Sequence, residues 1–197
     1  MITSIQSSFI EHKLTILRNK KTSNTLFRQT MNETSYLIAA EVLKYMSYKK
    51  VAVQTPLIKT FGKKLDQKII LVPILRAGLG LLEGFVKFLP DAEKGHIGLY
   101  RDEQTYKPVE YLFKLPKTKN KKVLVLDPML ATGNSSVAAI NLIKSKDVVS
   151  KDIFLISLLA APEGLKNLKK HHKSIHIFTC KIDTKLNNKK FIVPGLG

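Results

Sequence analysis

The residues best suited to chemistry lie in one segment, which reads VLVLDPMLATGNSS from Val123 to Ser136. Four apolar residues lead into Asp127, and a turn of small and hydroxyl-bearing residues follows before a helical pattern begins at Val137. The free N–H groups of such a turn and the positive end of a helix dipole favour a phosphate dianion. Asp127 can accept hydrogen bonds from ribose hydroxyls or hold water around a Mg²⁺ ion. The segment predicts a sugar-phosphate site, although polar strand–turn–helix connections without a ligand are also common.

Two arginines are candidates for holding a second anionic group. Arg76 follows an apolar run and precedes Ala77 and Gly78, whose small size lets backbone amides approach an anion. A guanidinium fork suits a diphosphate, and the alternative is an arginine that caps a helix or joins an interface. Arg101 precedes a polar segment that predicts a flexible arm over the site, and its alternative role is a surface ion pair with Asp102 or Glu103.

Apolar runs alternate with helical patterns along most of the chain. This pattern predicts an α/β fold with a mainly parallel sheet flanked by helices, because strands buried on both faces are continuously apolar. Ligands of such sheets lie beyond the carboxyl ends of the strands, where Asp127, Arg76 and Arg101 fall. Helical spacing predicts an N-terminal helical region over 25–47, and the alternating segment 51–61 predicts a hairpin or an edge strand. The other predicted strands are 69–75, 96–101, 109–115, 123–126, 153–159 and 175–180, and the other predicted helices are 79–88, 137–144 and 163–171.

Length and composition bound the class of protein. A chain of 197 residues, 44% of them hydrophobic, has the size of one domain and can bury a core. A membrane span is not expected, because no run of about 18 apolar residues occurs. The first residues lack the basic and apolar regions of a signal peptide. The single cysteine, Cys180, fits a reducing cytoplasm and lies in an apolar run, where we expect it to be buried and inert.

The charge balance is strongly basic. The chain has 33 Lys and Arg residues against 15 Asp and Glu residues, a formal net charge of +18. Such a balance favours polyanionic partners. The lysines are scattered, so a solvated surface, attraction of a polyanionic substrate and incidental RNA binding all stay open as interpretations. Dedicated nucleic-acid binding is not expected, because no basic patch is interleaved with aromatic residues.

Four blocks of the sequence together resemble one enzyme family. DPMLATG at 127–133 is similar to the phosphoribosyl diphosphate (PRPP) signature of the type I phosphoribosyltransferases. Pro128 in place of a second acid is the form that uracil phosphoribosyltransferases carry. VPILRAGLG at 72–80, AAPEG at 160–164 and FIVPGLG at 191–197 match the same family in the same order. The resemblance implies a type I phosphoribosyltransferase fold with a β-arm, in a single domain over 1–197.

The implied reaction transfers the 5-phosphoribosyl group from PRPP to N1 of uracil and yields UMP and diphosphate. Mg²⁺ is the implied cofactor, held through PRPP and water rather than by direct protein ligands, with Asp127 as a candidate contact. The implied catalytic residues are Asp127, Arg76 and Arg101, which also bind PRPP. Ile192 and Gly197 are the implied uracil-binding residues, chiefly through backbone groups. The other implied PRPP-binding residues are Pro128, Met129, Leu130, Ala131, Thr132, Gly133, Asn134 and Ser135.

The sequence departs from the family pattern at two places. Asn134 stands where the family usually has a second glycine, and Asn tolerates a positive φ better than most residues, so we expect it to fit the loop. The sequence stops at Gly197, whereas family members continue with an Asp-containing tail that helps to bind uracil and PRPP. A truncated enzyme of reduced activity is therefore one alternative. A non-catalytic regulator that binds PRPP or RNA is another, although the DPMLATG and FIVPGLG blocks favour the enzyme.

The resemblance also implies partners and a location. GTP is a candidate effector that the resemblance implies, although the sequence shows no allosteric site. A homodimer or a higher symmetric oligomer is implied, with the N-terminal helices and the hairpin as candidate interface. The implied location is the cytoplasm.

Overall fold

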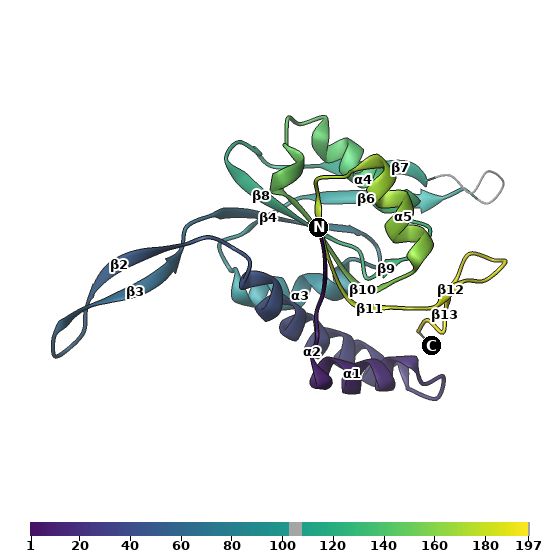
Figure 1. Cartoon of the computed structure of the whole chain (residues 1–197), viewed down its shortest axis with the longest axis horizontal. Helices are drawn as coiled ribbons and strands as arrows, with labels where there is room; N and C mark the ends of the chain where they lie inside the picture. The colour runs from purple at the N-terminus through teal and green to yellow at the C-terminus, as the bar shows by residue number, and fades with distance from the viewer. Residues whose placement is uncertain (103–107, 197) are drawn as a thin grey trace.

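A mainly parallel sheet forms the centre of the computed structural model, which describes residues 1–102 and 108–196 (Figure 1). Neighbouring strands in its main path are parallel, except for the last pair, which is antiparallel. The path runs in the order β1 (Ile2–Ser4), β11 (His176–Ile182), β10 (Ile153–Ala160), β8 (Lys121–Leu126), β4 (Lys68–Leu75), β6 (His96–Arg101) and β7 (Pro108–Lys114). Two short strands extend it, β5 (Glu93–Lys94) beside β4 and β9 (Met129–Leu130) beside β10.

Helices cover both faces of this sheet (Figure 1). One face carries α4 (Asn134–Lys144) and α5 (Pro162–His171), and the other carries α1 (Ser8–Arg18), α2 (Asn24–Leu43) and α3 (Leu79–Phe88). Side chains of β8 alternate between the two cores: Leu124 and Leu126 join the core of α1–α3, and Val123 and Val125 join the core of α4 and α5. Because both faces are covered, β10 is buried along its whole length, which explains its continuously apolar sequence.

The predicted α/β fold is thus confirmed, and the N-terminus contains more structure than predicted. Helix α1 precedes α2, and Ser7 caps it by accepting the N–H of Ile10 at 3.4 Å. Ser23 caps α2 in the same way, accepting the N–H of Leu26 at 3.3 Å. Strand β1 adds an edge to the sheet beside β11.

The segment predicted as a hairpin or an edge strand is a hairpin. Strands β2 (Tyr48–Gln54) and β3 (Lys59–Leu65) pair antiparallel and project from the body of the molecule (Figure 1). In its turn, the hydroxyl of Thr55 accepts the N–H of Leu57 at 3.2 Å and that of Ile58 at 3.0 Å. Apolar side chains gather at its tip, where Leu57 is 89% exposed.

The remaining elements are short. A 3₁₀ turn, η1 (Ser150–Asp152), precedes β10, and strands β12 (Lys185–Leu186) and β13 (Ile192–Val193) pair antiparallel near the C-terminus. Cys180 is buried in β11, as predicted, and burial raises the pKa of its thiol to about 12. Across the described part of the chain, no helix combines the length and the apolar character needed to cross a membrane.

Candidate active site

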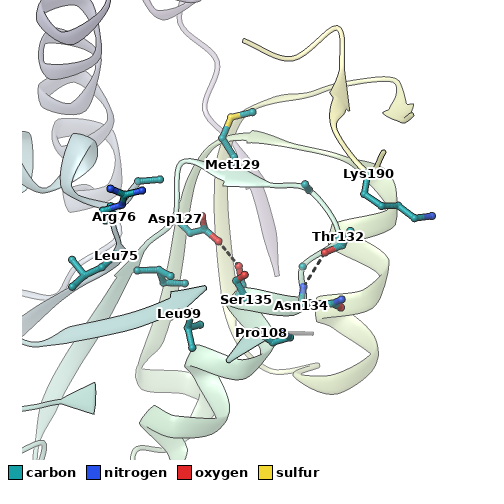
Figure 2. Close-up of a pocket in the computed structure, with 15 residues that line it drawn as sticks. Leu75, Arg76, Leu99, Pro108, Asp127, Met129, Thr132, Asn134, Ser135 and Lys190 are labelled. Carbon is teal, nitrogen blue, oxygen red and sulfur yellow. Dashed lines mark hydrogen bonds between the residues drawn. The ribbon is translucent and has the colours of Figure 1, made fainter. Parts of the chain in front are cut away.

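A cavity of about 230 Å³ opens at the carboxyl ends of β4 and β8 (Figure 2). Arg76 and Asp127 are 51 positions apart in the sequence. They lie in the same wall of the cavity because these strand ends are neighbours. The loop before α4 and the start of that helix form the opposite wall. The structure therefore brings the predicted residues Arg76 and Asp127 together at this edge of the sheet. Its lining residues include Leu75, Ala77, Leu99, Pro108, Met129, Ala131, Thr132, Gly133, Asn134, Ser135, Ser136 and Lys190.

Gly133 lets the loop turn into α4. It occupies the cap position of the helix with a φ of 79°, in the left-handed region that other residues rarely adopt. A Cβ at this position would lie 2.8 Å from the carbonyl oxygen of Gly164. The N-terminus of α4 therefore faces the cavity, and the hydroxyls of Thr132 and Ser135 lie beside it (Figure 2). This arrangement favours an anion, because backbone N–H groups and the helix dipole act together.

The start of α5 supports the loop from behind. The Ala161 N–H donates to the Leu130 carbonyl at 2.9 Å. Gly164 packs so closely that a Cβ would lie 2.3 Å from the Ala131 carbonyl oxygen and 2.8 Å from that of Leu130. The AAPEG block therefore supports the loop backbone. In the described part of the chain, none of its side chains lines the cavity.

Asp127 is the carboxylate of this cavity. Its N–H donates to the Ile156 carbonyl at 3.0 Å, which fixes the residue against β10. The Ser136 hydroxyl donates to Oδ2 at 2.7 Å. Burial raises the pKa of the Asp127 carboxyl, and the hydrogen bonds from Ser136 and from the Met129 N–H oppose this rise. Ser136 belongs to the hydroxyl-rich turn that was expected to offer donors to a phosphate, and in the structure its hydroxyl donates to Asp127.

Arg76 lies on the neighbouring strand end. Its side chain is exposed at the rim of the cavity, and the Leu75–Arg76 peptide bond is cis. The turn that follows is tight: the Gly78 N–H donates to the Ile74 carbonyl at 2.8 Å. A Cβ on Gly78 would lie 2.4 Å from the Leu126 carbonyl oxygen, so only glycine allows the turn to pack against the end of β8. The structure thus brings Arg76 and Asp127 to the same opening (Figure 2).

Not every predicted residue lines the cavity. Pro128 and Leu130 are buried behind it, and the Pro128 carbonyl accepts the N–H groups of Leu158 and Leu159 at 3.1 and 3.0 Å. Arg101 ends β6, but the orientation of its side chain lies outside the described structure, as does Gly197. Ile192 is buried in β13, in the C-terminal segment next to the site.

Asn134 corrects one expectation. The loop does not require Asn134 to adopt a positive φ, because Gly133 takes that conformation and Asn134 begins α4. The Asn134 side chain instead contacts α5, where Asn167 Nδ2 donates to its Oδ1 at 2.9 Å. The same Nδ2 donates to the Thr132 carbonyl at 2.8 Å. Asn167 therefore joins Thr132 and Asn134 of the loop 131–135, the anion loop, to α5, a role that its sequence context did not indicate.

An apolar cavity of about 280 Å³ lies next to the polar one. Ala77 and Met129 line both, so the two cavities are neighbours. Leu196 of the C-terminal segment and Phe27 of α2 also line the apolar cavity. Within residues 1–102 and 108–196, no three His, Cys, Asp or Glu side chains gather as a metal site would require.

Comparison with known proteins places this geometry in a family. The family model described as "Uracil phosphoribosyltransferase" matches residues 4–197. Uracil phosphoribosyltransferase from Lactococcus lactis subsp. lactis (strain IL1403) is 45% identical over 195 residues, 98% of this chain and 92% of that protein. The enzyme of the same name from Dictyoglomus thermophilum is 47% identical over 199 residues, 100% of this chain and 95% of that protein.

Solved structures share the fold of this chain. The AQ2163 protein from Aquifex aeolicus superposes with a TM-score of 0.92 at 36% identity, covering 100% of this chain and 94% of that one. Adenine phosphoribosyltransferase from Thermoanaerobacter pseudethanolicus shares the fold with a TM-score of 0.56 at 16% identity, over 88% of this chain and 99% of that one. The chain belongs to the uracil phosphoribosyltransferase family.

Proposed function

We propose that this protein transfers the 5-phosphoribosyl group of PRPP to N1 of uracil, giving UMP and diphosphate. The observation that carries the proposal is one cavity in which the α4 N-terminus, the Asp127 carboxylate and the Arg76 side chain converge. Such a cavity offers a phosphate site, a group for ribose hydroxyls and a cation for a diphosphate. The similarity to enzymes named uracil phosphoribosyltransferase favours this activity over that of a non-catalytic regulator.

We assign a part of PRPP to each wall of the cavity. The 5′-phosphate lies on the loop 131–135, where the N–H groups of the α4 start and the Thr132 hydroxyl can donate to it. Asp127 accepts from the ribose hydroxyls, and Arg76 holds the diphosphate with a guanidinium fork. We assign Arg101 to the diphosphate as well, on the basis of the family resemblance and its place at the end of β6.

The chemistry needs no nucleophile from the protein. The C1–O bond to diphosphate breaks and its electron pair leaves with the diphosphate, while the N1–C1 bond forms and N1 releases its proton to water. The protein accelerates this step by holding the two substrates in line and by stabilising the separated charges. Mg²⁺, when bound with PRPP, supplies further neutralisation of the diphosphate. Asp127 suits such an ion, because Mg²⁺ in proteins keeps its water and takes few carboxylates.

We place uracil where the two cavities meet, between Met129 and the C-terminal segment. Main-chain groups of Ile192 and Gly197 read its alternating donors and acceptors. The apolar side chains of Met129 and Leu196 support this position, because they give the flat base a dry surface next to the ribose site.

The domain organisation, the cellular location, the effector and the oligomeric state are proposals as well. We propose one catalytic domain over 1–197, a cytoplasmic location in which Cys180 stays reduced, and GTP as an effector. We propose a homodimer or higher oligomer that covers the exposed apolar tip of the hairpin, where Leu57 and Ile58 are 89% and 67% exposed.

A coupled assay tests the activity. Purified protein with PRPP, Mg²⁺ and uracil should form UMP and diphosphate in equal amounts, and cytosine or hypoxanthine in place of uracil should give no nucleotide. Absence of turnover with every base would refute the proposal, and turnover with a purine alone would refute the uracil site.

A further inference from the structure

A largely buried cluster of charge helps to hold the C-terminal segment beside the base site, together with the pairing of β12 and β13. Arg18, the last residue of α1, donates from one guanidinium nitrogen to Asp183 Oδ1 at 2.6 Å and from the other to Oδ2 at 2.9 Å. The second nitrogen also donates to the Gly195 carbonyl at 2.8 Å. The Gly195 N–H in turn donates to Asp183 Oδ2 at 2.9 Å. Three chain segments therefore meet in one closed set of hydrogen bonds.

Two members of this cluster are fixed to the body of the protein. Asp183 follows the end of β11, and its N–H donates to the Ala160 carbonyl of β10 at 2.8 Å. Arg18 ends a helix whose Leu14 and Leu17 are buried in the core, and a cation there also interacts favourably with the helix dipole. Gly195 has no such support from regular structure, because β13 ends at Val193. The cluster therefore fixes the backbone of Gly195, beyond the β12–β13 pair that holds Ile192 and Val193.

The surroundings make the cluster strong. The Asp183 side chain is 3% exposed and that of Arg18 is 23% exposed, so water and salt screen their attraction only weakly. The two hydrogen bonds from the Arg18 guanidinium to Asp183 fix the relative orientation of the two side chains as well as their separation. Gly195 has a φ of 72°, and a Cβ there would lie 2.4 Å from the Ile192 carbonyl oxygen, so the segment is folded tightly on itself. Moving Gly195 therefore moves Ile192 with it.

We infer that Arg18 and Asp183 are positioning residues for uracil: they hold the segment 192–196 in the conformation that presents its backbone groups to the base. This inference rests on the proposed function for the identity of the ligand. Neither residue is among those that line the phosphate cavity in the described structure. Loss of the pair should therefore weaken the base half of the site and leave the PRPP half intact.

The test compares Arg18→Met with a matched control, Lys13→Met. Lys13 lies on the same helix and pairs with Glu33 of α2 at 2.6 Å, so its loss also removes one charge and one ion pair of α1. For Arg18→Met we expect kcat/KM for uracil to fall at least about tenfold, since the loss of one hydrogen bond to a charged group weakens an interaction by about that factor or more. The KM for PRPP should stay within about twofold of the wild type, as for independent sites. Lys13→Met should change neither constant.

Hydrogen exchange gives a readout that does not depend on turnover. The Gly195 amide should be protected in the wild-type protein and should exchange faster in Arg18→Met, but not in Lys13→Met. If Arg18→Met does not fold, Arg18→Lys, which keeps the charge but not the fork, and Asp183→Asn take its place. An unprotected Gly195 amide in the wild type, or equal effects on uracil and PRPP, would overturn the inference. Absence of UMP from the wild type would instead refute the proposed function.

Discussion

Gly164→Ala perturbs the phosphate site without touching any side chain that we propose to bind PRPP. The added Cβ would lie 2.3 Å from the Ala131 carbonyl oxygen, well inside the ordinary contact distance of 3.4 Å. The two atoms nearest to this Cβ, the carbonyl oxygens of Ala131 and Leu130, belong to the backbone, so the anion loop and the start of α5 must separate. Overpacking of this kind costs about 1–3 kcal/mol. Alanine regains up to about 1 kcal/mol through its higher helix propensity. We therefore expect a net loss of about 1–2 kcal/mol in the free energy of unfolding.

The functional effect should exceed the effect on stability. A displaced loop no longer aims its N–H groups at the 5′-phosphate, and errors of this size in position lower rates by up to about a hundredfold. Denaturant unfolding measures the first effect, and kcat/KM for PRPP measures the second. Gly62→Ala is the control, because the Cβ there meets only Val53 Cγ2 at 3.7 Å. If Gly164→Ala matched this control in both measurements, the close packing of α5 on the loop would not position the phosphate.

Three further predictions concern the same cavity. Asp127→Ala should abolish PRPP binding in calorimetry whereas Asp91→Ala should not, and unchanged affinity would remove Asp127 from the site. Ser136→Ala removes a hydrogen bond that favours the Asp127 carboxylate, so the pKa of Asp127 should rise further and the acid limb of kcat/KM for PRPP should move to higher pH; an unmoved limb would contradict this. Asn167→Ala leaves the Thr132 carbonyl without its donor and should raise the KM for PRPP by about five- to tenfold, the effect of one hydrogen bond. Asn134→Gly keeps that bond and should change the KM less, and the reverse order would refute the role of Asn167.

Much of the fold could be predicted because its signals are local. Continuous apolar runs identified the central strands, and the change from an apolar strand to a hydroxyl-rich turn identified Asp127 and the loop before α4. Arg76 could be placed beside Asp127 because both residues follow predicted strands, and the carboxyl ends of parallel strands meet at one edge of the sheet. Sequence and structure agree here because each signal lies within one short segment or follows from the geometry of a parallel sheet.

The elements that escaped prediction depend on distant partners. Strand β1 has only three residues and exists because it pairs with β11, about 175 positions away in the numbering. The Arg18–Asp183 pair joins residues 165 positions apart, and neither residue stands in a distinctive local pattern. Asn167 contacts the anion loop through the packing of α5, which spacing along the chain does not reveal. Such contacts follow from tertiary structure alone.

A crystal structure of the protein with UMP tests the central claim most directly. The claim is that a sugar-phosphate half and a base half meet in the cavity at the ends of β4 and β8. We predict the 5′-phosphate at the N-terminus of α4, the ribose hydroxyls on Asp127, and the uracil ring against Met129 with its polar edge on the segment that contains Ile192. A phosphate bound away from Thr132 and Gly133, or a base that points away from the C-terminal segment, would contradict the account.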